Sequence, residues 1–228
     1  MDKIAIIVAA GSGTRMQSDL PKQFLPLAGK AILLHTAEAF IRAFPDIKII
    51  LVLPSDQIAY GRQLLQEQPY KSQVTVTAGG NSRFQSVANG LALVTEDSIV
   101  FVHDGVRCLI SPSLIQRCYH AALQNGSAIP VCPATDSMRI ISTAGKQQTS
   151  KTIDRASIRL VQTPQTFRSS LLKQAFDQPY QAGFTDEASV LEAMGAPVFL
   201  VEGDPDNLKI TRPIDLIVAE TIIAQRAK

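Results

Sequence analysis

Short apolar runs and amphipathic segments alternate along this chain, and that alternation restricts the fold more than any other feature of the sequence. Four apolar runs bounded by Pro, Gly or Asp predict buried strands: Ile4–Val8, Ile47–Leu53, Val74–Thr77 and Ile99–Val102. Segments with a helical pattern lie between them: Ile32–Phe44, Gln57–Gln68 and Ser82–Val94. This repetition of strand and helix predicts an α/β fold with a Rossmann-like doubly wound, mostly parallel sheet.

The second half of the chain continues this order and then departs from it. Further helices and strands are expected over Ser113–Gln124, Ala128–Val131, Leu171–Phe176, Glu187–Met194, Val198–Glu202 and Pro213–Gln225. Residues Asp136–Val161 alternate polar and β-branched side chains around Thr143-Ala144-Gly145, which predicts a long hairpin. Because it is too polar for a central strand pair, we expect a protruding β-hairpin arm at residues 134–160. With 228 residues and 46% hydrophobic content, the chain can form one domain over residues 1–228.

Charge and cysteine content argue against several classes of protein. The net charge of +2 and the lack of a Lys or Arg run argue against a nucleic-acid partner. The first apolar run is too short for a signal sequence or a membrane span, so no membrane partner is expected. The three cysteines, Cys108, Cys118 and Cys132, lack CxxC spacing, which argues against a disulfide framework or a zinc site. We therefore expect a cytoplasmic protein in a reducing environment.

The first predicted strand runs directly into a glycine-rich loop, VAAGSGTRMQSDLPKQF at residues 8–24. Gly11 and Gly13 let the backbone approach a phosphate and point N–H donors toward it. Arg15 offers a forked pair of donors, and Lys22 a compact charge that can stabilise a transition state at phosphorus. The alternative is an ordinary glycine-rich connection with two solvated cations. Neither a dinucleotide fingerprint nor a Walker A motif is present, so the loop predicts a different nucleotide-binding device.

A second glycine-containing loop, GGNSRFQSV at residues 79–87, follows the third predicted strand and opens a helix. Its backbone donors and the Ser86 hydroxyl would lie at the carboxyl edge of the sheet, where α/β folds bind ligands. That position suits a nucleobase and ribose. The alternative is a Gly-Gly turn in which Ser82 serves as the helix N-cap.

The segment HDGVR at residues 103–107 ends the fourth predicted strand at the same edge. Asp104 is a hard oxygen ligand suited to Mg²⁺, which would bridge nucleotide phosphates, and Arg107 can hold a second phosphate. The alternative is a turn stabilised by a salt bridge. His103 is assigned a structural role and no proton transfer.

Three further segments carry charges whose roles the residues alone leave open. Lys209 precedes the closing helix and can orient an anionic acceptor, and Asp206 can share the metal, although both can equally be surface charges. The segment TDEAS at residues 185–189 is an acidic helix start that requires only a capping role. Arg155 follows the hairpin and would usually be solvated, yet exchange of such an arm across a two-fold axis would bring it to a neighbour's site.

Seven motifs occur in order over nearly the whole chain: AAGSGTRM, LPKQF, GGNSRFQSV, HDGVR, QTPQTF, TDEAS and DNLKITRP. With them the chain resembles the nucleotidyltransferases that attach a nucleoside monophosphate to a sugar phosphate or polyol phosphate. Within that group it is most similar to the cytidylyltransferases of the non-mevalonate isoprenoid pathway. The resemblance implies a sheet of the nucleotide-diphospho-sugar transferase type and transfer of CMP from CTP to 2-C-methyl-D-erythritol 4-phosphate, with release of pyrophosphate.

The resemblance also implies roles for individual residues. Arg15 and Lys22 are expected to stabilise the charged α-phosphate transition state, while Arg155 and Lys209 position the acceptor phosphate. Substrate contacts are expected from Ala10, Gly11, Gly13, Gly80, Ser86, Asp104, Arg107, Ser137 and Thr163. Asp104 and Asp206 are the expected ligands of a cofactor, Mg²⁺ or another divalent cation. A homodimer through the arm is the expected assembly, and TDEAS is expected near the acceptor pocket. Cys108 stands where the family usually has proline, which leaves the course of that loop open.

Direct in-line attack of the acceptor phosphate on the α-phosphorus of CTP is the expected mechanism. No strong general base is required, because a phosphate monoester is already largely ionised near neutral pH. Two other functions remain open. Ribitol 5-phosphate cytidylyltransferases look similar, and a non-catalytic nucleotide-binding protein could share the fold, although a sensor would not need transition-state cations.

Overall fold

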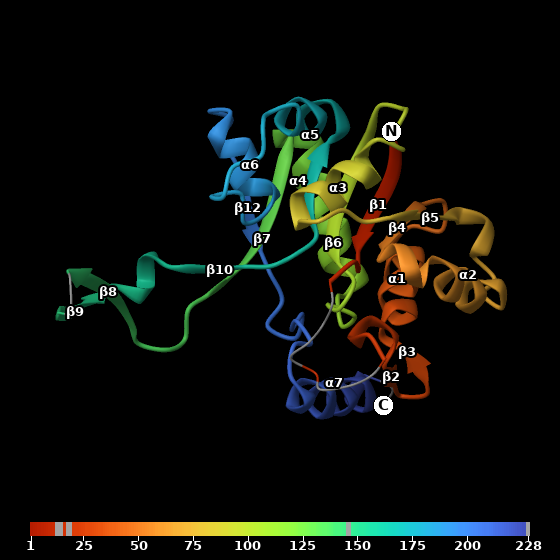
Figure 1. The fold of residues 1–228 in the computed structure, drawn as a ribbon, viewed down its shortest axis with the longest axis horizontal. Coiled ribbons are helices and arrows are strands. Elements are labelled where there is room, and N and C mark those ends of the chain that lie inside the picture. The colour runs from red at the N-terminus through yellow and green to blue at the C-terminus, as the bar shows by residue number, and fades with distance from the viewer. Residues whose placement is uncertain (12–15, 17–19, 145–146, 227–228) are drawn as a thin grey trace.

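The computed structural model describes residues 1–11, 16, 20–144 and 147–226 (Figure 1). Its strands are β1 (Asp2–Val8), β2 (Pro26–Leu27), β3 (Lys30–Ala31), β4 (Lys48–Leu53), β5 (Val74–Ala78), β6 (Ser98–Asp104), β7 (Ser127–Pro133), β8 (Met138–Ala144), β9 (Gln147–Ile153), β10 (Arg159–Val161), β11 (Gln165–Arg168) and β12 (Leu200–Glu202). Its helices are α1 (Ile32–Ala43), α2 (Ile58–Gln66), α3 (Arg83–Leu91), α4 (Pro112–Asn125), α5 (Ser169–Phe176), α6 (Glu187–Ala193) and α7 (Pro213–Arg226). Short 3₁₀ turns are η2 (Lys22–Phe24), η3 (Ser55–Gln57), η4 (Lys71–Gln73) and η5 (Arg155–Ser157). In the part of the chain described, no helix combines the length and the hydrophobicity that a membrane crossing requires.

The central sheet has the strand order β10-β7-β11-β6-β1-β4-β5, and β12 also pairs with β7. Strands β6, β1, β4 and β5 are parallel neighbours, which confirms the predicted doubly wound, mostly parallel sheet. Strand β11, which lies antiparallel between β6 and β7, is not among the strands predicted from the sequence. Its short QTFR sequence lacks the apolar run that marks the other central strands, and only its position between two strands makes it part of the sheet.

The two faces of the sheet are covered by different helices, because alternate residues of each strand point to opposite sides. In β1, Ala5 and Ile7 pack in one apolar cluster with residues of α1 and α4. Ile4 and Ile6 pack in a second cluster with residues of α3, α5 and α6. Full burial of an isoleucine contributes about 1.5–3 kcal/mol, so this alternation fixes the register of the central strand.

A third apolar cluster lies beyond the carboxyl edge of the sheet. It joins Leu27 and Ile32 to Val106 of the HDGVR segment, to Ile210 and to Ala219 of α7. Figure 1 shows α7 across the lower end of the sheet, below the point where β1 ends. This packing brings the chain around Ile210, which is distant in sequence, to the carboxyl ends of β1 and β6.

The β-hairpin arm, residues 134–160, projects from one side of the sheet (Figure 1, left). Strands β8 and β9 pair antiparallel from Met138↔Ile153 onward, as the alternating pattern predicts. The predicted hairpin extended too far, however: residues 159–161 form β10 and pair with β7, with Val161 opposite Val131. The predicted polar hairpin therefore ends at Ile153, and the chain returns to the central sheet.

Candidate functional site

A cavity of about 450 Å³ opens at the carboxyl ends of β1 and β6, next to the loop that follows β5. Its lining residues are Val8, Ala9, Ala10, Gly11, Lys22, Gln23, Gly80, Asn81, Ser82, Arg83, Ser86, Asp104, Val106 and Lys209. This is the edge at which open α/β sheets bind ligands, and it brings together segments from the first and last thirds of the chain.

One wall of the cavity comes from the end of β1 and from η2. Ala10 and Gly11 line it as predicted, and among the described residues, the chain neighbours of Gly11 apart, no heavy atom lies within 4 Å of the place where a β-carbon on Gly11 would stand. The buried Gln23 donates a hydrogen bond from Nε2 to the Ala9 carbonyl at 2.9 Å, and the Phe24 ring is buried next to it. These contacts place Lys22 on the cavity wall. Gly13 and Arg15 lie outside the described residues.

The opposite wall is the turn between β5 and α3. Ser82 caps α3 by accepting a hydrogen bond from the Gln85 amide, so the capping role considered for it is confirmed. The Ser86 hydroxyl accepts from the Gly80 amide at 3.1 Å and donates to the Ser82 carbonyl at 2.8 Å. A β-carbon on Gly79 would collide with the Ala10 side chain. Ser86 therefore shapes the turn around Gly80, and glycine lets the two walls approach each other.

Asp104 lies at the bottom of the cavity among three cationic groups. Its Oδ2 accepts from Lys209 Nζ at 2.8 Å and lies 3.6 Å from Arg107 Nε, while its Oδ1 lies 3.5 Å from Arg83 Nη2. Burial alone would raise the pKa of Asp104, but Arg83, Lys209 and Arg107 outweigh burial and hold the pKa well below its usual range. The carboxylate is therefore ionised and holds Lys209 at the cavity.

Arg83, one of the three cations near Asp104, also forms an ion pair with the buried Glu187. Glu187 is 1% exposed and accepts hydrogen bonds from both terminal nitrogens of Arg83, one of them 3.1 Å long. Burial opposes the charge on Arg83, yet Glu187 and Asp104 outweigh burial and raise its pKa, so the guanidinium remains charged. Both residues belong to segments predicted to lie near the site, GGNSRFQSV and TDEAS, but neither was assigned an individual role from the sequence. One signal was present: Arg83 lies in the first turn of a predicted helix, where the helix dipole disfavours a cation unless a carboxylate compensates.

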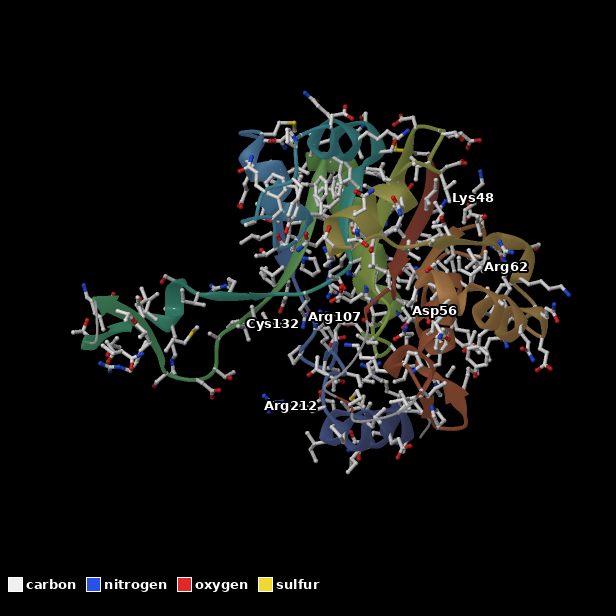
Figure 2. The ribbon with its side chains drawn as sticks, in the orientation of Figure 1. Lys48, Asp56, Arg62, Arg107, Cys132 and Arg212 are labelled. Carbon is white, nitrogen blue, oxygen red and sulfur yellow. The ribbon has the colours of Figure 1, made fainter. Side chains whose placement is uncertain are left out.

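The loop that carries Lys209 is fixed by two amide side chains. Gln162 accepts from the Asp204 amide at 3.1 Å and donates to the Asp204 carbonyl at 2.8 Å. Asn207 Nδ2 donates to the Thr163 backbone carbonyl at 2.8 Å, and the backbone carbonyl of Asn207 accepts from Arg107 Nη1 at 2.8 Å. Arg107 therefore tethers this loop and does not line the cavity as a phosphate ligand would; Figure 2 shows it between the sheet and α7.

Thr163 and His103 stabilise the turn that follows β6. Thr163 Oγ1 accepts from the Asp104 amide at 3.1 Å, so its hydroxyl hydrogen is left to donate to His103 Nδ1, also at 3.1 Å. The other ring nitrogen, Nε2, then donates to the Arg107 carbonyl at 3.2 Å. Both side chains are buried and neither lines the cavity. His103 thus has a structural position, as expected. Thr163 was predicted to contact a substrate, but it supports the turn after β6 and does not line the cavity.

We expect His103 to make folding stability depend on pH. Burial lowers its pKa to about 4 from 6.5, so below pH 6.5 the unfolded chain takes up a proton that the folded protein excludes. Stability is therefore lost as pH falls from 6.5 toward 4, by about 2 kcal/mol between pH 8 and pH 5. Urea unfolding at several pH values measures this loss. His103→Asn should remove that part of the slope, and an unchanged slope in the variant would contradict the assignment.

Two predicted site residues lie on the arm: Arg155, expected to position the acceptor phosphate, and Ser137, expected to contact a substrate. Arg155 is exposed and donates to the Thr135 carbonyl at 2.7 Å, and Ser137 is exposed beside the start of β8. Neither lines the cavity of its own chain. A single chain therefore does not bring Arg155 and Lys209 together.

The predicted pair of metal ligands is not assembled either. The Asp206 carboxylate pairs with Arg226 at 3.2 Å and does not line the cavity, which leaves Asp104 as the only carboxylate among the described lining residues. The described part of the chain contains no group of three or more His, Cys, Asp or Glu side chains placed to hold a metal. The sequence could not anticipate this, because the loop turns Asp206 toward α7.

Cys108, which left the course of the HDGVR loop open in the sequence, lies in an intact turn. Its side chain is buried in the third apolar cluster, and burial raises the pKa of its thiol to about 12. The Arg107 amide still bonds to the Asp104 carbonyl at 3.0 Å. The loop therefore keeps Asp104 at the cavity.

Comparison with known proteins gives a match over almost the full chain. The family model described as "IspD: 2-C-methyl-D-erythritol 4-phosphate cytidylyltransferase" matches residues 3–225. A relative of that name from Bacteroides thetaiotaomicron is 48% identical and covers 98% of this chain and 100% of its own length. Another from Geobacillus kaustophilus is 39% identical, with 99% of each chain covered.

Solved structures agree with this match. A crystal structure of 4-diphosphocytidyl-2C-methyl-D-erythritol synthase from Anaerococcus prevotii superposes with a TM-score of 0.83 at 27% identity, covering 98% of this chain and 96% of that one. The Francisella tularensis 2-C-methyl-D-erythritol 4-phosphate cytidylyltransferase gives 0.79 at 33% identity, covering 97% and 99%. With residues 3–225 matched by the family model, and relatives of that name 48% and 39% identical over almost their full length, the chain belongs to the 2-C-methyl-D-erythritol 4-phosphate cytidylyltransferase family.

Proposed function

We propose that residues 1–228 form one nucleotidyltransferase domain that transfers CMP from CTP to 2-C-methyl-D-erythritol 4-phosphate. The products are 4-diphosphocytidyl-2-C-methyl-D-erythritol and pyrophosphate. The family match over residues 3–225 supports this reaction. The observation that carries it is the cavity at the carboxyl edge of the sheet, where Lys22 and Lys209 come from opposite ends of the chain. Two anionic substrates that must approach each other require such a cationic enclosure.

The chain's own residues support direct in-line transfer. The acceptor phosphate is largely ionised near neutral pH, so it can attack the α-phosphorus of CTP without a general base. Lys22, together with Arg15 of the same loop, would stabilise the negative charge that develops on the α-phosphate. Lys209, held by Asp104 at 2.8 Å, would hold the acceptor phosphate. Catalysis then consists of positioning and charge stabilisation.

Divalent metal fits this cavity only in combination with the nucleotide. Asp104 can offer a carboxylate oxygen, but Lys209 and Arg107 already surround its Oδ2. Since Mg²⁺ commonly binds through substrate phosphates, waters and one or two carboxylates, the residues present fit an ion that arrives with CTP. Such an ion would neutralise phosphate charge, with Asp104 as its only protein carboxylate among the described lining residues.

The arm supports a homodimer in which each chain completes its partner's site. Several large apolar side chains on the arm and at its base are exposed: Ile140, Ile141, Leu160, Val161 and Leu200. A second copy would cover them. The same exchange would carry Arg155 and Ser137 toward the neighbour's acceptor pocket. We also place the protein in the cytoplasm, because its three cysteines are free thiols.

A pyrophosphate-release assay tests the reaction and the acceptor. With CTP and Mg²⁺ we expect turnover on 2-C-methyl-D-erythritol 4-phosphate, little on ribitol 5-phosphate, and loss of activity when EDTA removes the metal. Activity only with ribitol 5-phosphate would overturn the acceptor assignment. CTP binding without pyrophosphate release on either acceptor would favour a non-catalytic nucleotide-binding protein.

A further inference from the structure

We infer that Glu187 is a positioning residue for the transfer reaction: its buried carboxylate binds both terminal nitrogens of Arg83, so that Arg83 makes only a long contact with Asp104 Oδ1 and Asp104 Oδ2 remains paired with Lys209. This inference rests on the proposed function, since it assigns Lys209 to the acceptor phosphate. Glu187 itself does not line the cavity and acts through Arg83.

Arg83 is bound more closely by Glu187 than by Asp104. Both oxygens of the Glu187 carboxylate accept from the guanidinium, whereas Arg83 reaches Asp104 through one nitrogen at 3.5 Å. Arg83 lines the cavity and its side chain is 29% exposed, while that of Glu187 is 1% exposed. The guanidinium is therefore directed mainly at the buried acid and only weakly at the site.

Hydrogen bonds at the start of α6 hold Glu187 in place. It is the first residue of α6, whose N-terminus has a capping box between Asp186 and Ser189. Gln165 of β11 donates to Asp186 Oδ2 and accepts from the Ala188 amide, both at 2.8 Å. Because β11 is part of the central sheet, the position of the Glu187 carboxylate relative to β6 and Asp104 is fixed.

Three cationic side chains surround the Asp104 carboxylate. Arg83, Arg107 and Lys209 all lie within 4 Å of its two oxygens, yet only Lys209 makes a short contact, at 2.8 Å. Without the charge of Glu187, the partly buried Arg83 would need another anion, and Asp104 is the carboxylate already within reach. Arg83, which now lies 3.5 Å from Oδ1, would then pair more closely with Asp104 and weaken the pairing of Lys209 with Oδ2. Glu187 bonds to the GGNSRFQSV segment through the Arg83 side chain, whereas the hydrogen bonds that shape its turn join Gly80, Ser86 and Ser82, so we expect the CTP contacts there to change less than the acceptor site.

The test is Glu187→Gln, which keeps the shape of the side chain and removes its charge. We expect kcat/KM for 2-C-methyl-D-erythritol 4-phosphate to fall by about tenfold, while the dissociation constant of CTP, measured by calorimetry, changes less than about twofold. Glu192→Gln is the matched control, because it removes an exposed carboxylate from the same helix and should leave both values unchanged.

A double-mutant cycle separates positioning from a structural role. In an Arg83→Gln background, Glu187→Gln should lower kcat/KM little further, because the residue through which it acts is gone. That double variant also leaves no unpaired buried charge, so it remains informative if Glu187→Gln alone fails to fold. Additive losses, or equal weakening of CTP and acceptor, would overturn the inference. A wild-type protein without activity on this acceptor would instead overturn the proposed function, so the two failures are distinguishable.

Discussion

Replacing Lys22 by alanine is expected to lower kcat by about 10²–10³-fold, as the loss of one preorganised charge-stabilising group does in other transfer reactions. The effect is expected to be large because the fold fixes the position of the Lys22 backbone before the substrates bind. Gln23 is bonded to the Ala9 carbonyl and Phe24 is buried against α1, so the backbone of η2 holds Lys22 on the cavity wall. A charge fixed before the reaction needs no reorganisation as negative charge develops at phosphorus. Steady-state pyrophosphate release measures the effect.

Stability provides the control for this variant. The Lys22 side chain is not part of an apolar cluster, so Lys22→Ala should change the free energy of unfolding by less than about 1 kcal/mol. Lys71→Ala is a matched substitution, because Lys71 is exposed on η4, bonds to the Gln66 carbonyl and lies outside the cavity. It should retain full turnover. Near-normal turnover of Lys22→Ala would remove Lys22 from the catalytic residues.

Mixing two inactive variants is expected to restore activity. Lys22→Ala disables the chain's own cavity, whereas Arg155→Ala removes a residue that, in the proposed dimer, serves the neighbour's site. In a dimer formed from one chain of each kind, one site carries both substitutions and the other carries neither. Random assembly of equal amounts makes half of the dimers mixed, so about a quarter of all sites are intact. Co-expression with two affinity tags and a pyrophosphate-release assay measures this recovery.

The control mixture combines Lys22→Ala with Lys209→Ala. Both residues line the cavity of the same chain, so every site carries at least one substitution and no recovery is expected. If the mixture with Arg155→Ala is no more active than this control, Arg155 does not act across the dimer. The exposed apolar residues of the arm would then need another explanation.

The sequence by itself determined the parallel part of the sheet and the location of the site. The apolar run Ile49–Leu53, for example, is the buried part of parallel strand β4, and its hydrophobic pattern and its length suffice to identify it. The loops after β1, β5 and β6 must then lie close together, because the carboxyl ends of parallel strands lie at the same edge of the sheet. Local sequence was thus sufficient to place four residues at the site, and all four line the cavity: Ala10, Gly11, Gly80 and Asp104.

Only the tertiary structure decided which charges face one another. Asp206 and Lys209 are three residues apart, yet the loop turns one toward Arg226 and the other toward Asp104. Arg83 and Glu187 meet across 104 residues, and no local pattern encodes such a distant pair. Secondary structure follows from periodicity within a few residues, whereas ion pairs at a site depend on packing between elements, which a single sequence does not display.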